Sequence, residues 1–451
     1  MTNNNIPVNA GGALGRWEPE NESFWNATGR SVANRTLVVT TMGLILAFIM
    51  WFVVSALVVR LPQIGFQLTT GQLFWLAAMP GLAGGTLRLV HMFLVPIFGT
   101  RKVVSISTLS LIIPAVGWYY AVQDPTTSFT WLMVLAFLAG LGGGNFSSFM
   151  PSTSLFYPKR LQGTALAIQA GIGNFGVSVV QFVTPWIIGF SLIGASTWLG
   201  ASQTMTKGGV ETQVFLQNAV AVYVPIILVV GLLAWASLRS VPVKANFAEQ
   251  FDIFGSRHTW SMTSLYMMTF GAFSGLSATF PLLIKQCYGG LEGAPDPLAW
   301  AFYGPLVGSV ARVVAGPVSD RLGGARVTHW AALGMLACAV VVPFFTTPTS
   351  MAQFPMFVGA MLTLFFFAGV GNASTFKQMP MIFPPRQAGG VIGFTAAIAA
   401  YGPFIFGMLF SWAFAIWGTP NAVFWALAVF FAINLVMNWQ MYARRGAATP
   451  C

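Results

Sequence analysis

Twelve apolar stretches, each long enough to cross a lipid bilayer, constrain the fold of this 451-residue chain. A membrane-spanning helix needs about 20 consecutive, mostly apolar residues. Because a backbone in lipid must satisfy its own hydrogen bonds, the stretches predict an all-α integral membrane protein. They cover residues 37–60, 70–97, 102–122, 131–154, 162–191, 218–238, 259–285, 297–318, 326–347, 353–376, 388–416 and 420–442.

The placement of charge predicts the orientation. Only 7% of the residues are charged, against about 25% in soluble domains. The residues behind the net charge of +11 lie in alternate loops and the C-terminal tail. This distribution follows the positive-inside rule and differs from that of a nucleic-acid-binding surface. The intervening loops hold little beyond Arg60, Lys207 and Lys285. We therefore expect a lipid bilayer as partner, no nucleic acid, and both termini in the cytoplasm. The basic residues of the alternate loops and tail are Arg101, Lys102, Lys159, Arg160, Arg239, Lys244, Arg257, Arg321, Arg326, Arg386, Arg444 and Arg445.

The chain repeats itself at about half its length. GNFSSFMPSTSLFYPKRLQGTALAI from Gly144 is similar to GNASTFKQMPMIFPPRQAGGVIGFT from Gly371, and Asn145 aligns with Asn372 at an offset of 227 residues. The repeat predicts two pseudo-symmetric six-helix halves. The expected parts are a cytoplasmic N-terminal tail (1–36), an N-terminal half (37–238), a cytoplasmic linker (239–258), a C-terminal half (259–443) and a C-terminal tail (444–451).

Parallel halves with a substrate site near the midplane describe the major facilitator plan of transporters. SDRLGGARV, from Ser319 to Val327, resembles the loop signature of that superfamily. Its counterpart FGTRKV keeps Gly99 and the basic pair but lacks the aspartate. We expect the major facilitator fold.

Two arginines remain inside the predicted spans. Arg88 lies deep in the second stretch and Arg312 deep in the eighth, at nearly repeat-equivalent positions. None of the ten acidic residues lies well inside a span, so no carboxylate is available to pair them. An arginine at a helix centre costs at least about 2.5 kcal/mol. The simplest missing counter-ion is a small anionic substrate; the alternative is that backbone carbonyls and water satisfy both arginines.

The fifth stretch carries small and amide side chains on one helical face. Gly171 and Asn174 belong to this face, within QAGIGNFG from Gln169 to Gly176. Small residues allow close helix packing, and amides form interhelical hydrogen bonds. We expect both a packing groove and a cavity wall, with Asn174 donating to the substrate. The counterpart GFTAAIAAYG lacks the asparagine, so the site should be asymmetric.

These segments resemble a known family. GTALAIQAGIGNFG and GFTAAIAAYG look like the paired nitrate signatures of the nitrate/nitrite porter family, and LRLVHMFLVPIFG and VARVVAGPVSDRLGGARVT look like its two arginine segments. GRWEPENESFW and IIPAVGWYYAVQD resemble its NarK-type bacterial members. The resemblance implies a nitrate and nitrite transporter of the bacterial inner membrane, functionally coupled to a nitrate reductase.

The resemblance also implies residue roles. Arg88 and Arg312 would clamp the anion, Phe146 and Phe270 would stack on it, and Tyr266 and Asn174 would hydrogen-bond it. Phe48 would line the same region. The halves would rock around the site in alternating access, and a bound anion would neutralise the repulsion between the arginines. Nitrate/nitrite exchange is then the leading mechanism.

Nitrate/proton symport on the same fold is the main alternative. His91 lies three residues after Arg88, and histidine titrates near neutral pH. It is either a packing residue or a proton carrier. Lys377 either extends to the interface or guides anions.

An anion sensor, an organic-anion carrier and a membrane enzyme are weaker alternatives. The sequence has no large appended signalling domain, and its spans have no nucleophile–base pair. Cys287, Cys338 and Cys451 have neither metal-ligand nor disulfide spacing. We expect no enzymatic activity, no metal and no cofactor.

Overall fold

The computed structural model describes residues 12–191, 200–207, 209–241, 248–447, 449 and 451. Residues 1–11 of the predicted N-terminal tail, 242–247 of the predicted linker, and 448 and 450 of the predicted C-terminal tail lie outside the described residues. In the described chain, twelve helices are long and apolar enough to cross a membrane, which confirms the predicted number of spans.

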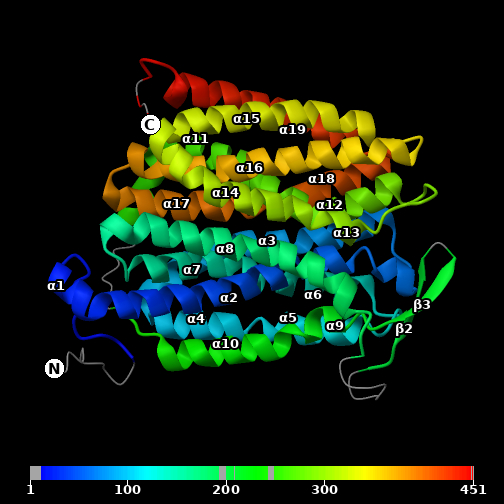
Figure 1. Ribbon diagram of the computed structural model, residues 1–451, viewed down its shortest axis with the longest axis horizontal. Coiled ribbons are helices and arrows are strands. Elements are labelled where there is room, and N and C mark those ends of the chain that lie inside the picture. Colours follow the sequence, from blue (N-terminus) through cyan, green and yellow to red (C-terminus); the bar gives the residue numbers. More distant parts are fainter. Residues whose placement is uncertain (1–11, 192–199, 208, 242–247, 448, 450) are drawn as a thin grey trace.

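The helices run side by side along one direction, and a β-hairpin projects at one end (Figure 1). Its antiparallel strands are β2 (Gln203–Lys207) and β3 (Val210–Val214). We call this the hairpin end. We call the opposite end, where the predicted basic loops and the C-terminus lie, the basic end.

The first six spans form the lower bundle of Figure 1. Several spans consist of two consecutive helices. The helices are α1 (Glu22–Phe24), α2 (Arg30–Leu57), α3 (Thr70–Phe98), α4 (Thr100–Leu109), α5 (Ile112–Ala121), α6 (Phe129–Ala139), α7 (Leu141–Ser154), α8 (Lys159–Ile187), α9 (Asn218–Ala221) and α10 (Tyr223–Ser237).

The last six spans form the upper bundle. Their helices are α11 (Arg257–Tyr266), α12 (Ala272–Tyr288), α13 (Pro297–Ala301), α14 (Tyr303–Leu322), α15 (Gly324–Val341), α16 (Phe354–Ile382), α17 (Pro385–Ala399), α18 (Gly402–Trp417) and α19 (Asn421–Asn438). The π-helical turns η1 (Trp25–Gly29), η5 (Met267–Gly271) and η8 (Trp439–Ala443) continue the helices beside them.

The first span begins earlier than the apolar pattern predicts. Its helical segment starts at Glu22, inside the predicted tail, because the Asn21 side chain accepts hydrogen bonds from two backbone N–H groups of the first turn. Trp25 then packs with Phe156 and Tyr157 of the α7–α8 connection. Hydropathy missed this turn because its stabilising contacts are a cap and aromatic packing.

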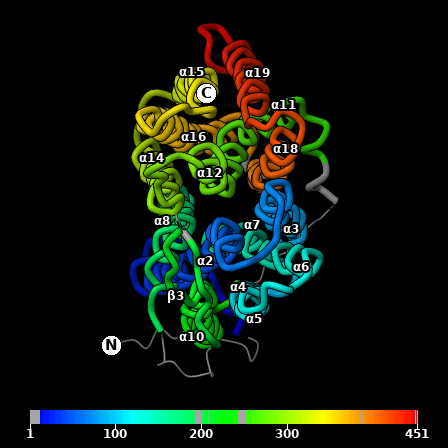
Figure 2. Tube along the Cα trace, turned by 90° about the vertical axis from the view of Figure 1, so that its right-hand side faces the viewer, coloured from blue at the N-terminus to red at the C-terminus, as the bar shows by residue number. Residues whose placement is uncertain are grey.

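Glycine lets the two bundles approach each other closely. Figure 2 shows α3 beside α18 and α8 beside α14 at the junction between the bundles. A Cβ added at Gly407 of α18 would lie 2.6 Å from the Cβ of Ala78 on α3, and one at Gly81 would collide with the backbone of α18. Small residues of α3 that precede Arg88, Ala78 and Gly81, therefore pack directly against α18, as is common at interfaces between membrane helices.

Candidate functional site

Arg88 is completely buried on α3 at the junction of the two halves. Its Nε donates to the Gly143 carbonyl of α7 at 2.9 Å, and one terminal nitrogen donates to the Ala396 carbonyl of α17 at 2.7 Å. Ala396 is in the last turn of α17, where carbonyls carry a partial negative charge. The other terminal nitrogen, Nη2, is buried without a protein partner. Backbone carbonyls, the predicted alternative to a substrate, therefore satisfy only part of this guanidinium.

Three aromatic rings surround the Arg88 guanidinium. Its central carbon is 4.6 Å from the ring centroid of Phe146, 5.1 Å from Trp51 and 5.2 Å from Phe270. Arginine over an aromatic face at such distances is a cation–π contact. The predicted residues Phe146 and Phe270 thus share one arginine, although they belong to different halves.

Arg312 on α14 has fewer contacts. Its guanidinium lies over Phe376 of α16 at 5.3 Å, and its Nη1 is buried without a hydrogen-bond partner. The residue is 6% exposed. This second arginine is held mainly by packing, so more of its donor capacity is free.

Tyr266 connects the two arginines. Its ring stacks on Phe270 with centroids 5.4 Å apart and an interplanar angle of 4°, and it lies 4.8 Å from Phe376. The buried hydroxyl lies near both Arg88 and Arg312, and it has no partner that meets normal hydrogen-bond geometry. The arginines also repel each other through space. One continuous aromatic row therefore joins two like charges.

A π-helical turn positions Tyr266 and Phe270. In η5 the Ala272 N–H donates to the Met267 carbonyl, five residues earlier. Such turns inside α-helices occur frequently at functional sites. The sequence carries no signal for this turn, although the family resemblance implies a substrate-binding role for both Tyr266 and Phe270.

Asn174 of α8 is fully buried, and neither atom of its amide has a hydrogen-bond partner. A buried amide without a partner is costly, so this position is poised to bind something polar. Gly171 has another role in the packing, because an added Cβ would lie 2.5 Å from the Val313 side chain of α14. On the predicted helical face of α8, Gly171 lets α14 approach closely, while the Asn174 amide keeps its donors and its acceptor free.

Phe48 and His91 lie at the margin of the arginine site. Phe48 on α2 is buried and contacts Trp51 and Phe146 edge-on, at centroid distances of 5.5 Å and 6.4 Å. His91 Nδ1 is 3.0 Å from the Ser148 hydroxyl of α7. This contact is the one expected of a packing histidine.

In the described part of the chain, no carboxylate is within ion-pair distance of Arg88 or Arg312, and no cluster of metal-binding side chains occurs. Asp320 of the signature pairs with Lys377 at 2.5 Å near the basic end. Lys377 therefore neutralises the signature aspartate. Neither predicted role, interface anchor or anion guide, included this partner.

A cleft of about 620 Å³ at the basic end is distinct from the arginine site. Its lining residues are Arg326, Trp439, Ala443, Arg444 and Arg445. None of the predicted site residues belongs to it. The buried polar groups without partners, rather than this cleft, mark the candidate site.

The sequence profile of the Major Facilitator Superfamily matches residues 40–376. The chain belongs to this superfamily. As a Major Facilitator Superfamily protein it is a multi-pass membrane transporter and not an enzyme. Solved structures agree on the fold alone. A D-xylose–proton symporter has a TM-score of 0.64 at 16% identity, with 91% of this chain and 98% of that chain covered.

Relatives identify the branch of the superfamily. The "Probable nitrate/nitrite antiporter NarK2" of Thermus thermophilus is 63% identical over 436 residues, covering 96% of this transporter and 97% of the relative. The "Nitrate/nitrite transporter NarU" of Escherichia coli K12 is 36% identical, covering 95% and 96%. The transporter therefore belongs to the nitrate/nitrite porter family, as the sequence motifs predict.

Three further residues lie at the candidate site without having been predicted from the sequence. Trp51 and Phe376 contact the arginines, and Asn372 on α16 is buried with both amide atoms unpartnered. The chain has 40 phenylalanines, so no aromatic residue stands out by type. Asn372 did carry a signal, because it is an amide inside a span and the repeat partner of Asn145.

Proposed function

We propose that the transporter exchanges nitrate and nitrite across the bacterial inner membrane, with the anion held between Arg88 and Arg312. The observation that supports this most strongly is the pair of buried arginines. Each keeps a nitrogen without a partner, and no carboxylate of the described chain lies within ion-pair distance. The names of both relatives give nitrate and nitrite as their substrates.

The geometry favours a small planar anion. Guanidinium donors form a planar fork that matches a planar oxyanion, which the point charge of lysine does not. Phe146 and Phe270 offer flat faces beside Arg88, and Tyr266 adds a hydroxyl between the arginines. Asn174 contributes a free amide from α8. In this proposal the anion supplies the hydrogen bonds and the negative charge that the site lacks.

Binding couples to closure through charge. Without an anion, bringing Arg312 toward Arg88 strengthens their repulsion inside a low-dielectric protein. A bound anion removes this cost, so the loaded carrier reorients and the empty carrier does not. This obligate loading makes exchange the favoured mode. The proposed orientation has both termini and the basic end in the cytoplasm, where nitrate would reach a reductase.

The test uses proteoliposomes preloaded with nitrite, with nitrate or with neither anion. Nitrate uptake that requires internal anion and is insensitive to an imposed pH gradient is the expected result. Uptake into empty vesicles driven by external acid would instead establish nitrate/proton symport. Failure to take up nitrate or nitrite under any condition would reject the substrate assignment.

A further inference from the structure

An ion pair between a buried arginine and a partly exposed aspartate joins the two halves at the hairpin end. Arg60, which follows α2, is 2% exposed, and its Nη2 donates to both carboxylate oxygens of Asp296 at 2.9 Å and 2.7 Å. Asp296 is the N-cap of α13 and also accepts from the Leu298 N–H. The sequence predicts Arg60 in a loop and carries no signal that pairs it with a residue 236 positions away.

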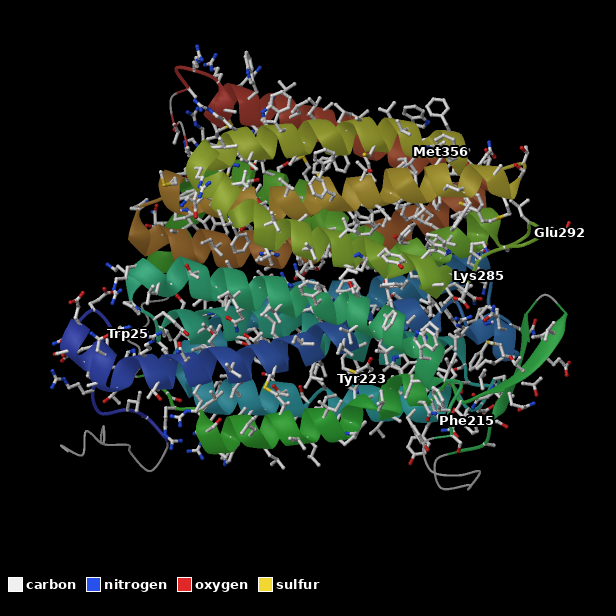
Figure 3. All side chains as sticks on the ribbon, viewed as in Figure 1. Trp25, Phe215, Tyr223, Lys285, Glu292 and Met356 are labelled. Carbon is white, nitrogen blue, oxygen red and sulfur yellow. The ribbon has the colours of Figure 1, made fainter. Side chains whose placement is uncertain are left out.

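A second cation lies beside this pair. Lys285 of α12 donates to the Val59 carbonyl at 2.9 Å, next to Arg60 in the chain. Figure 3 places Lys285 between the two bundles near the hairpin end. Lys285 and Arg60 repel each other electrostatically. Of these two neighbouring cations, Arg60 pairs with Asp296 and Lys285 contacts a backbone carbonyl, and the Arg60 Nε remains buried without a partner.

This cluster is distinct from the central site. Arg60 lies nine residues beyond Trp51, the α2 residue that contacts Arg88. At about 1.5 Å per helical residue, that separation along α2 is roughly 14 Å. Arg60 therefore lies closer to the hairpin end than the Arg88 site does.

We propose that Arg60 and Lys285 form an outer anion site, in which an incoming planar oxyanion takes the place of the Asp296 carboxylate when the halves separate. A carboxylate and a nitrate are both planar oxyanions. The Asp296 carboxylate therefore fills the anion position beside Arg60 when no external anion is bound. Removing one partner of a buried ion pair is costly, whereas exchanging it for an equivalent charge is not. External anion therefore favours opening, and the site refills with Asp296 as the anion moves inward.

This outer site goes beyond the proposed exchange function but rests on it for the identity of the anion. It also makes the hairpin-end closure depend on ligand rather than on a permanent latch. Arg60 is a gating and binding residue in this scheme, while Arg88 and Arg312 remain the central pair.

The test measures opening directly. Spin labels at Gln67→Cys and Gly290→Cys lie on exposed positions of opposite halves, and a Cβ at Gly290 meets no atom within 4 Å. The three native cysteines are first replaced by serine, and exchange by this background is verified. The distance between the labels is recorded while sodium nitrate is titrated, with sodium gluconate holding ionic strength constant.

Replacing Asp296 and replacing Arg60 should change the nitrate dependence of opening in opposite directions. Asp296→Asn removes the competing carboxylate, so half-maximal opening should need about tenfold less nitrate. Arg60→Gln should abolish the nitrate dependence of the distance. Glu292→Gln is the matched control in the same loop, since Glu292 is exposed, and its titration should follow the unmodified background.

A simple latch predicts something different. If both variants open the hairpin end equally without nitrate, or if Arg60→Gln keeps the original titration, the outer site is rejected. Repeating the titration with Arg312→Lys separates the two proposals, because the central site is lost while opening by nitrate should persist. Exchange activity surviving in Arg312→Lys would reject the central clamp and leave the outer site standing.

Discussion

The two intramembrane arginines occupy related positions in the two halves, but their surroundings differ. Arg88 donates to Gly143 and Ala396 and is enclosed by three aromatic rings. Arg312 lies over one ring and keeps a buried nitrogen without a partner. The two halves of the repeat thus share a buried arginine charge, but the contacts of the two arginines differ. We interpret Arg88 as an anchored residue that belongs to the structure, and Arg312 as the one whose interactions depend most on ligand.

Replacing either arginine with lysine should have the largest effect on transport. Arg88→Lys and Arg312→Lys each keep one positive charge and lose the planar fork. Hydrogen bonds to charged groups are worth about 1.5–3 kcal/mol each, so losing one or two of them should slow exchange about 100-fold or more. Counterflow of labelled nitrate measures the rate, and membrane insertion is checked by protein quantity. Transport at the original rate in either variant would remove the clamp.

Stability should separate the same two variants. Arg88→Lys loses the hydrogen bond from Nε to Gly143, so the free energy of unfolding should fall by about 2 kcal/mol. Arg312→Lys loses no hydrogen bond to protein by the observed contacts, so its stability should stay near the original. Thermal unfolding in detergent without anion provides the measurement. Equal losses in both variants would contradict the difference between an anchored and a ligand-dependent arginine.

The membrane spans could be predicted from the sequence more completely than the site. The number of spans and the depth of the arginines follow from local hydropathy and charge, which can be read from the sequence directly. The carbonyl partners of Arg88 could not be predicted, because every residue has a carbonyl and only packing selects Gly143 and Ala396. The pairing of Arg60 with Asp296 likewise depends on how the two halves meet.

Two asparagines of the N-terminal half give a smaller contrast. Asn174 has no protein partner, whereas the Asn145 side chain donates to the Ser107 carbonyl at 3.3 Å. Asn174→Ala should weaken nitrate binding about tenfold, a loss of about 1.4 kcal/mol, and leave stability unchanged. Asn145→Ala should leave binding unchanged and lower stability by about 1 kcal/mol. Calorimetric titration and thermal unfolding test both, and the reverse pattern would exclude Asn174 from the site.

The smallest expected effect concerns His91, whose only repeat counterpart by position is an alanine, Ala315. His91→Gln preserves a hydrogen-bonding side chain opposite Ser148, so nitrate/nitrite exchange should keep its rate and its pH dependence between about pH 6 and 8. Ser148→Ala is the matched control, since it removes the same contact and keeps the imidazole. A packing role predicts similar, small effects from both changes. If only His91→Gln eliminates uptake driven by a pH gradient, the histidine carries a proton, and the two halves differ in coupling as well as in anion binding.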